Sequence, residues 1–154
     1  MNWSDPDKWL QLKQGAGCPM CEDIHLPENQ HSYLVVELEH AIVRFPKNQV
    51  LRGWTVVFAK RHVSELFEFS DQELCAFWRS VSQVGRALYT IFQPPKINYC
   101  VYGNLIPHVH CHLIPQSYDH APQMLTVIDS KTVELAREEY QRIVKEMKVQ
   151  LVNV

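Results

Sequence analysis

The chain has 154 residues and 46% hydrophobic content, which fits one globular domain, and we predict a single domain over residues 1–154. Its formal charge of −2 at pH 7 gives no electrostatic reason to expect a nucleic acid or an anionic membrane as partner. No apolar run approaches the roughly 20 residues of a membrane span, and no signal-peptide pattern opens the chain. Five cysteines are an odd number for a secreted disulfide framework. We therefore predict a cytoplasmic protein.

Three segments in the first 60 residues have the patterns of regular structure. The stretch "SDPDKWLQLKQG" predicts a short helix with Ser4 as its N-cap and Gly15 as its stop. Residues 32–45 are rich in β-branched side chains, and the charged "ELEH" within them indicates a turn between two strands. Residues 52–60 predict a third strand, which the chain enters through Gly53.

The rest of the chain predicts two helices around a pair of strands. Ser70 and Glu73 form a capping box ahead of a long amphipathic helix that we expect to end at Phe92. The other expected elements, in chain order, are strands at 97–102 and 108–114, joined by a Gly103-Asn104 turn, and a capped, charge-rich helix over 129–148. This order predicts an α+β fold with an antiparallel sheet of about five strands and two main helices.

The run "HVHCHLIP" at 108–115 places histidine at three alternate positions, His108, His110 and His112. Alternate residues of a strand share one face, so we expect the three imidazoles on one side of the sheet. Same-face neighbours are roughly 6.6 Å apart, which puts the outer two about 13 Å apart and argues against one shared metal ion. The alternative is a surface strand with solvated imidazoles.

Cys18 and Cys21 form a CxxC, which supplies half of a tetrahedral zinc site. A thioredoxin-like redox pair is the alternative, but that motif needs a following helix in a βαβ setting. Here "EDIHLPENQHS" follows and is typical of a loop. A further candidate ligand, His62, comes directly after the predicted strand at 52–60.

Over residues 18–116 the sequence resembles the histidine triad (HIT) family, whose signature His-φ-His-φ-His-φ-φ is matched by "HVHCHLI". The segments "RGWTVVFAKRHVSELFEFSDQEL" and "NYCVYGNLIP" are similar to the parts of the family that surround this signature. The CxxC resembles that of a subgroup with structural zinc. By this resemblance the zinc ligands are Cys18, Cys21, His62 and His108.

The resemblance also implies a reaction on the α-phosphorus of a nucleoside phosphate derivative, such as a dinucleoside polyphosphate. His110 would attack to give a nucleotidyl-histidine that water cleaves, because a neutral imidazole is a competent nucleophile near pH 7. His112 would donate a hydrogen bond to an oxygen where charge develops. In the uridylyltransferase branch this third position resembles glutamine, so a histidine here favours hydrolysis. Family members are commonly homodimers, and we expect one here.

Contacts to the substrate follow from the same resemblance. Asn98 and Asn104 occupy places where the family holds phosphate oxygens with amide side chains. The ribose-binding residue of the family would fall at Pro46, and Asn48 is the nearest residue that could replace it. Leu105 stands where the family often has a serine or threonine that assists the leaving group. Three alternatives stay open: a phosphorylase or nucleotidyltransferase, a nucleotide-binding or interaction module without catalysis, and a redox CxxC protein.

Overall fold

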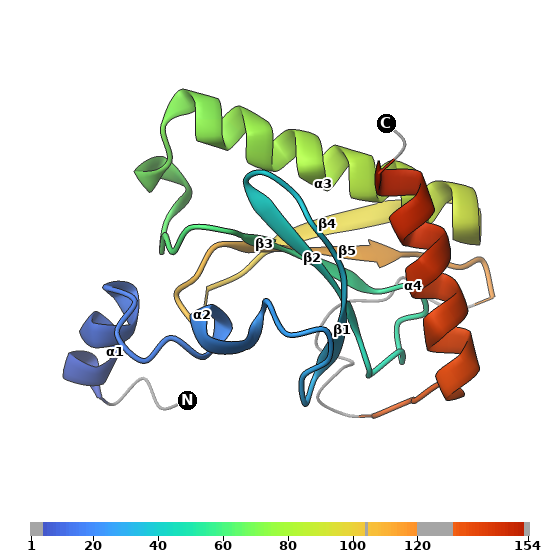
Figure 1. The fold of residues 1–154 in the computed structure, drawn as a ribbon, viewed down its shortest axis with the longest axis horizontal. Helices are drawn as coiled ribbons and strands as arrows, with labels where there is room; N and C mark the ends of the chain where they lie inside the picture. The colour runs from blue at the N-terminus through green and yellow to red at the C-terminus, as the bar shows by residue number, and fades with distance from the viewer. Residues whose placement is uncertain (1–4, 104, 120–130, 153–154) are drawn as a thin grey trace.

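A five-stranded sheet forms the centre of the structure, a computed structural model that describes residues 5–103, 105–119 and 131–152 (Figure 1). In spatial order its strands are β1 (Ser32–Glu37), β2 (Ala41–Pro46), β3 (Thr55–Ala59), β5 (His110–Pro115) and β4 (Ile97–Val101). Each neighbouring pair is antiparallel, which confirms the predicted α+β class and the predicted sheet.

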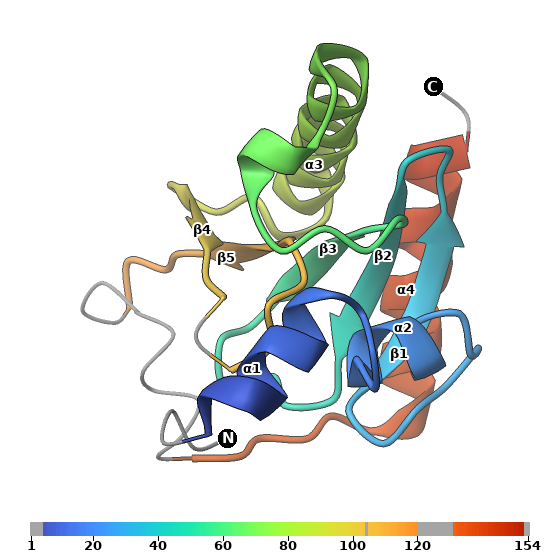
Figure 2. The same cartoon turned by 90° about the vertical axis from the view of Figure 1, so that its left-hand side faces the viewer.

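Two long helices, α3 (Asp71–Phe92) and α4 (Arg137–Val152), contact each other and pack on the sheet (Figures 1 and 2). The shorter helical elements are α1 (Pro6–Lys13), α2 (Pro19–Asp23) and the single turn η1 (Leu66–Glu68). Figure 2 shows α1 and α2 lying away from α3, on the other side of β3 and β5. Among the described residues, every helix is too short or too polar to reach across a bilayer.

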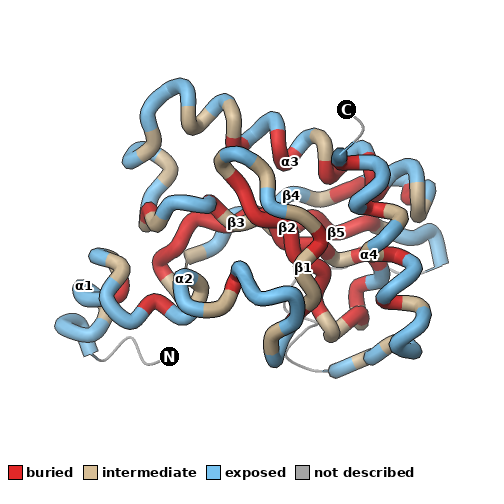
Figure 3. Tube along the Cα trace, viewed as in Figure 1, coloured by how far each residue is buried: buried red, intermediate tan, exposed pale blue. Residues whose placement is uncertain are grey.

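Strand alternation gives the sheet two chemically different faces. Val43, Val57 and Cys111 are register partners across three strands, are fully buried, and belong to the core that also includes residues of α3 and α4. Figure 3 shows that much of the buried chain follows the central strands. One residue further along each ladder, Arg44 is paired with Val56, and Val56 with His112, on the opposite face. The residues on one face of the sheet therefore form the core. The alternate residues on the opposite face, which include His112, lie on the side of the sheet away from the long helices.

The predicted capping box begins α3. The Ser70 side chain accepts a hydrogen bond from the backbone N–H of Glu73, and the Glu73 carboxylate accepts one from the backbone N–H of Ser70. The helix ends at Phe92, where Gln93 adopts a left-handed conformation with φ 46° ahead of the two prolines. Both predicted ends of this helix are confirmed.

Gly53 is needed where the chain enters β3. Its φ is +82°, and a Cβ there would lie 3.0 Å from Pro115 and 3.1 Å from the Phe92 ring. The side chain of Gln49 accepts a hydrogen bond from the Gly53 N–H, and its amide group donates to the carbonyl of Trp54. The turn before β3 is therefore braced from inside, which fixes the position of Trp54.

The N-terminal and C-terminal helices begin later than predicted. Asp5 rather than Ser4, which lies outside the described residues, caps α1 by accepting a hydrogen bond from the N–H of Lys8. Helix α4 starts at Arg137 instead of residue 129, because the backbone before it is hydrogen-bonded to the loop that precedes β3. The carbonyl of Val133 accepts from the backbone N–H of Gln49, and the carbonyl of Lys131 accepts from the side-chain amide of Asn48. The short helix α2, within a stretch expected to be irregular, was not predicted.

Arg44 is 1% exposed and ties the segment after α2 to the sheet. Its guanidinium donates to the carbonyls of Ile24, Leu26 and Ser32 and to the Ser32 hydroxyl, at 2.6–2.8 Å. Burial lowers the pKa of Arg44, and the nearby carboxylate of Asp23 opposes that effect. The charge is thus stabilised by four oxygen acceptors, and the residues that follow Cys18 and Cys21 are held against β2.

We expect Arg44→Met to lower the free energy of unfolding by about 3–5 kcal/mol, because it leaves buried carbonyls without donors. The matched control is Lys47→Met: Lys47 pairs with Glu28 at 2.7 Å on a partly exposed surface, and its loss should cost about 1 kcal/mol or less. Urea unfolding followed by circular dichroism measures both variants. Equal stability of the two would show that the Arg44 contacts contribute nothing.

Candidate active site and metal centre

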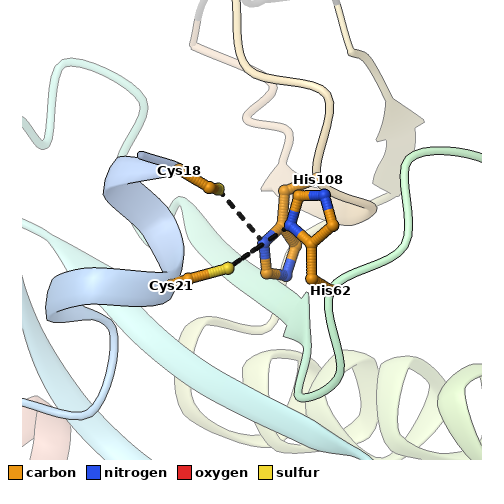
Figure 4. A group of neighbouring side chains, drawn as sticks. All are labelled: Cys18, Cys21, His62 and His108. Carbon is orange, nitrogen blue, oxygen red and sulfur yellow. Dashed lines mark hydrogen bonds between the residues drawn. The ribbon is translucent and has the colours of Figure 1, made fainter. Parts of the chain in front are cut away.

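Four side chains from three separate segments converge beside α2 (Figure 4). They are Cys18 and Cys21 at the start of α2, His62 after β3, and His108 before β5. One ligand atom from each lies within 4.8 Å of all the others. These are the four residues that the family resemblance implies as zinc ligands, and the fold brings all four together.

The donor set fits tetrahedral zinc. An ion that binds sulfur at about 2.3 Å and nitrogen at about 2.0–2.1 Å separates its ligand atoms by roughly 3.3–3.8 Å. Here Nδ1 of His108 lies 3.6 Å from Sγ of Cys18 and 3.5 Å from Sγ of Cys21, and Nδ1 of His62 lies 3.3 Å from Sγ of Cys21. Two cysteine sulfurs and two imidazole nitrogens at these separations could hold a tetrahedral zinc ion.

The outer nitrogens of both histidines are held by backbone carbonyls. Nε2 of His108 lies 2.9 Å from the carbonyl oxygen of Ala59, and Nε2 of His62 lies 3.2 Å from that of Lys13. Because a carbonyl only accepts, each histidine carries its proton on Nε2 and turns the lone pair of Nδ1 toward the cluster. Burial lowers the pKa of His108 to about 4, so this imidazole is neutral and ready to ligate at pH 7.

The predicted row of three histidines is divided between a metal cluster and a strand, and the predicted start of the strand at His108 was wrong. Strand β5 starts at His110, while His108 precedes it and its ring belongs to the cysteine cluster. Between them, the N–H of Val109 donates to the carbonyl of Val63, and the carbonyl of Val109 accepts from the N–H of Ala59. Only His110 and His112 lie together on the strand, with ring centroids 4.8 Å apart.

His110 has a defined tautomer. Its Nδ1 lies 2.6 Å from the carbonyl oxygen of His108, which can only accept, so the proton is on Nδ1 and the lone pair is on Nε2. The ring is 7% exposed and stacks on Phe58, and burial lowers the pKa of His110. In the neutral imidazole, the free lone pair on Nε2 can act as a nucleophile. The carbonyl that orients it belongs to a residue of the metal cluster.

His112 is enclosed by aromatic rings. Its centroid lies 5.7 Å from the stacked ring of Trp54 and 6.1 Å from that of Tyr102, with His110 edge-on. Burial, and then the neighbouring His110, lower the pKa of His112 to about 3. The imidazole is therefore neutral at pH 7, so it acts there as a hydrogen-bonding group without a charge.

The three asparagines predicted to bind substrate differ in their surroundings. Asn98 is half-buried on β4, two residues from Cys100, the register partner of His112, and on the same face. The side chain of Asn48 is hydrogen-bonded to the backbone: it accepts from the N–H groups of Val50 and Val133 and donates to the carbonyl of Lys131. Asn104 lies outside the described residues. Of the two that the structure describes, Asn98 lies on the face and strand next to His112.

Two aromatic contacts of the row were not predicted. Phe58, opposite His110 in the register, and Trp54, just before β3, each stack on a histidine of β5. Alternation along β3 from the histidine register was the signal that could have found Phe58.

The two basic residues before His62 point to another surface. Lys60 lies 3.3 Å from the carboxylate of Glu37, and Arg61 forms two hydrogen bonds with Glu73. Both line an open pocket of about 230 Å³ with His40 and Phe69. These cations are already paired with carboxylates.

Comparison with known proteins gives one consistent result. The HIT domain family model matches residues 28–119. The "Protein hit" of Bacillus subtilis is 30% identical over 87 residues, which cover 53% of this chain and 60% of the Bacillus protein. The chain thus aligns with three fifths of that relative's length.

Two solved structures share the fold. A histidine triad protein from Bradyrhizobium japonicum superposes with a TM-score of 0.72 at 19% identity, covering 84% of this chain and 97% of its own. A zinc-bound histidine triad family protein from Mycobacterium smegmatis superposes with a TM-score of 0.69 at 17% identity, covering 89% of this chain and 96% of its own. Both match nearly all of their own length.

Proposed function

Since the chain belongs to the HIT family, we propose that it is a nucleotide hydrolase that cleaves the α-phosphoryl bond of a nucleoside phosphate derivative through a nucleotidyl-histidine. The observation that carries the proposal is the tautomer of His110, whose Nδ1–H is donated to the His108 carbonyl and whose Nε2 lone pair is free. A dinucleoside polyphosphate is the substrate class we favour. Five free cysteines support a reducing, cytoplasmic location.

In this reaction Nε2 of His110 forms a bond to the α-phosphorus, and the bond from that phosphorus to the leaving oxygen breaks. Water then cleaves the phosphorus–nitrogen bond and frees the nucleotide and the histidine. Two steps with an intermediate replace one difficult displacement. Burial lowers the pKa of His110, which favours the neutral, nucleophilic form of the ring.

His112 would stabilise the charge that develops on the phosphoryl or leaving oxygen by donating a hydrogen bond. Asn98, on the same face of β4, is the described asparagine best placed to contact the phosphates. Asn104 and Asn48 remain candidates for phosphate and ribose contacts.

We assign a structural role to zinc, held by Cys18, Cys21, His62 and His108. The bound ion would fix the position of His108, whose carbonyl holds the proton of His110. The fold shared with the zinc-bound protein from Mycobacterium smegmatis and the donor geometry support this assignment.

Turnover of a dinucleoside tetraphosphate, with and without added inorganic phosphate, tests the reaction class. A hydrolase forms nucleoside monophosphate at a rate that does not depend on phosphate. A phosphate-dependent rate with nucleoside diphosphate as product would identify a phosphorylase. Nucleotide binding without turnover would identify a binding module, an alternative consistent with the exposed Leu105 where the family often has a hydroxyl.

We further propose a homodimer that forms through β4. This strand is at the edge of the sheet, so one side of its backbone is open to pairing. Three large side chains on or just after it, Tyr99, Val101 and Tyr102, are exposed by 38–46% in the single chain. A second copy that pairs along this edge would cover them.

Light scattering after size-exclusion chromatography should give about twice the chain mass of 18.0 kDa, with or without reducing agent. Val101→Glu should shift the protein toward monomer because it places a charge on the edge. The matched control is Val149→Glu, at an exposed position on α4, which should stay dimeric. A monomeric wild type at micromolar concentration would contradict the proposal.

A further inference from the structure

Trp54 makes a polar contact with His112 that none of the roles described so far uses. Its indole Nε1 lies 3.1 Å from Nδ1 of His112, and the two rings are stacked within 27° of parallel. An indole nitrogen is a donor only. Nδ1 of His112 must therefore accept, which leaves the proton of the neutral ring on Nε2.

We propose that Trp54 is a positioning residue that holds His112 in the Nε2–H tautomer, so that the second histidine of β5 presents a fixed neutral donor to the reacting phosphate. The role in the reaction rests on the proposed nucleotidyl transfer. The tautomer itself is a property of the free protein and can be measured without substrate.

The surroundings of Trp54 are built to keep this contact. The buried amide of Gln49, 2% exposed, bonds to the Gly53 N–H and to the Trp54 carbonyl, and the Trp54 N–H donates to Leu51. On the other side, Val56 at the start of β3 is the register partner of His112. The indole thus comes from a braced turn directly beside the strand that carries its acceptor.

The two histidines of β5 are held in opposite tautomers by two different groups. A carbonyl acceptor, that of His108, keeps the proton of His110 on Nδ1. A donor, the Trp54 indole, keeps the proton of His112 on Nε2. One ring therefore offers a lone pair at Nε2 and the other offers a proton at Nε2, which is the complementary pair that attack and charge stabilisation require.

Long-range ¹H–¹⁵N correlation spectra of the imidazoles test the proposal at neutral pH. Wild-type His112 should show a protonated Nε2 and an unprotonated Nδ1. Trp54→Phe keeps an aromatic ring but removes the donor, so His112 should become a mixture of both tautomers. With a nucleotide substrate, kcat should fall about tenfold and KM should change less than about twofold, because one neutral hydrogen bond is lost at the reacting groups only.

Trp78→Phe is the matched control, because Trp78 lies on α3, packs on Phe77 and undergoes the same chemical change. It should leave the His112 signals and kcat as in the wild type. A wild-type His112 protonated on Nδ1 would overturn the proposal even if Trp54→Phe failed to fold. So would a Trp54→Phe protein with an unchanged tautomer or an unchanged kcat. A wild type with the expected tautomer but no turnover of any nucleotide would refute the hydrolase proposal and leave the Trp54–His112 contact established.

Discussion

Replacing His110 with alanine should reduce nucleotide turnover on the order of 10⁴-fold or more, because loss of a covalent nucleophile has effects of this size. Binding of the nucleotide should survive, since it draws on other contacts. Steady-state rates and calorimetric titration measure the two quantities separately. His112→Ala should cost less, about 10²–10³-fold, because it removes one donor and leaves the nucleophile.

His31→Ala is the control for a histidine outside the row, because His31 lies on the exposed loop before β1. It should keep wild-type turnover and stability. Full activity in His110→Ala would remove this residue from the mechanism. Equal losses in His110→Ala and His112→Ala would remove the distinction between nucleophile and donor.

Loss of zinc should have the largest effect on stability. We expect about one zinc per chain, and removal by a chelator or by Cys18→Ser should unfold the N-terminal segment and sharply lower the melting temperature, because structural zinc sites contribute about 10–16 kcal/mol of apparent binding free energy. Activity should fall with the metal, since the carbonyl of His108 orients His110. Elemental analysis measures the zinc content, and thermal unfolding of the same samples measures the melting temperature.

Cys75→Ser is the matched control, because Cys75 is exposed on α3 and lies outside the cluster. It should keep both the zinc and the melting temperature. His62→Ala should follow Cys18→Ser, because it removes a ligand of the same cluster. Metal-free protein as stable as the zinc-loaded form would contradict a structural role for the ion.

Elements with a strong local signal were predictable. The capping box at Ser70 and the prolines after Gln93 defined α3 at both ends, because caps and breakers act through neighbouring residues. The four members of the cysteine–histidine cluster were also predicted to lie together, through the CxxC and the resemblance of the sequence to the family. Each of these patterns is complete within a short window or within a known motif.

What could not be predicted depends on contacts between distant segments. His108 was assigned to the strand because the alternation of His and apolar residues continues through it, but Val109 is bonded to both Val63 and Ala59. Two of the four acceptors of Arg44 lie in the segment after α2 and two belong to Ser32 at the start of β1, and the Trp54–His112 bond joins residues 58 positions apart. No periodicity in the sequence encodes such pairs.

The proposed reaction depends on covalent attachment of the nucleotide to His110. Rapid quench of the protein with a dinucleoside polyphosphate, followed by mass spectrometry of the intact chain and of its peptides, detects such an adduct. We predict an adduct of one nucleoside monophosphate, located on His110, that His112→Ala still forms and His110→Ala does not. An adduct on His108 or His112, or turnover without any adduct at times when the intermediate should accumulate, would contradict the assignment.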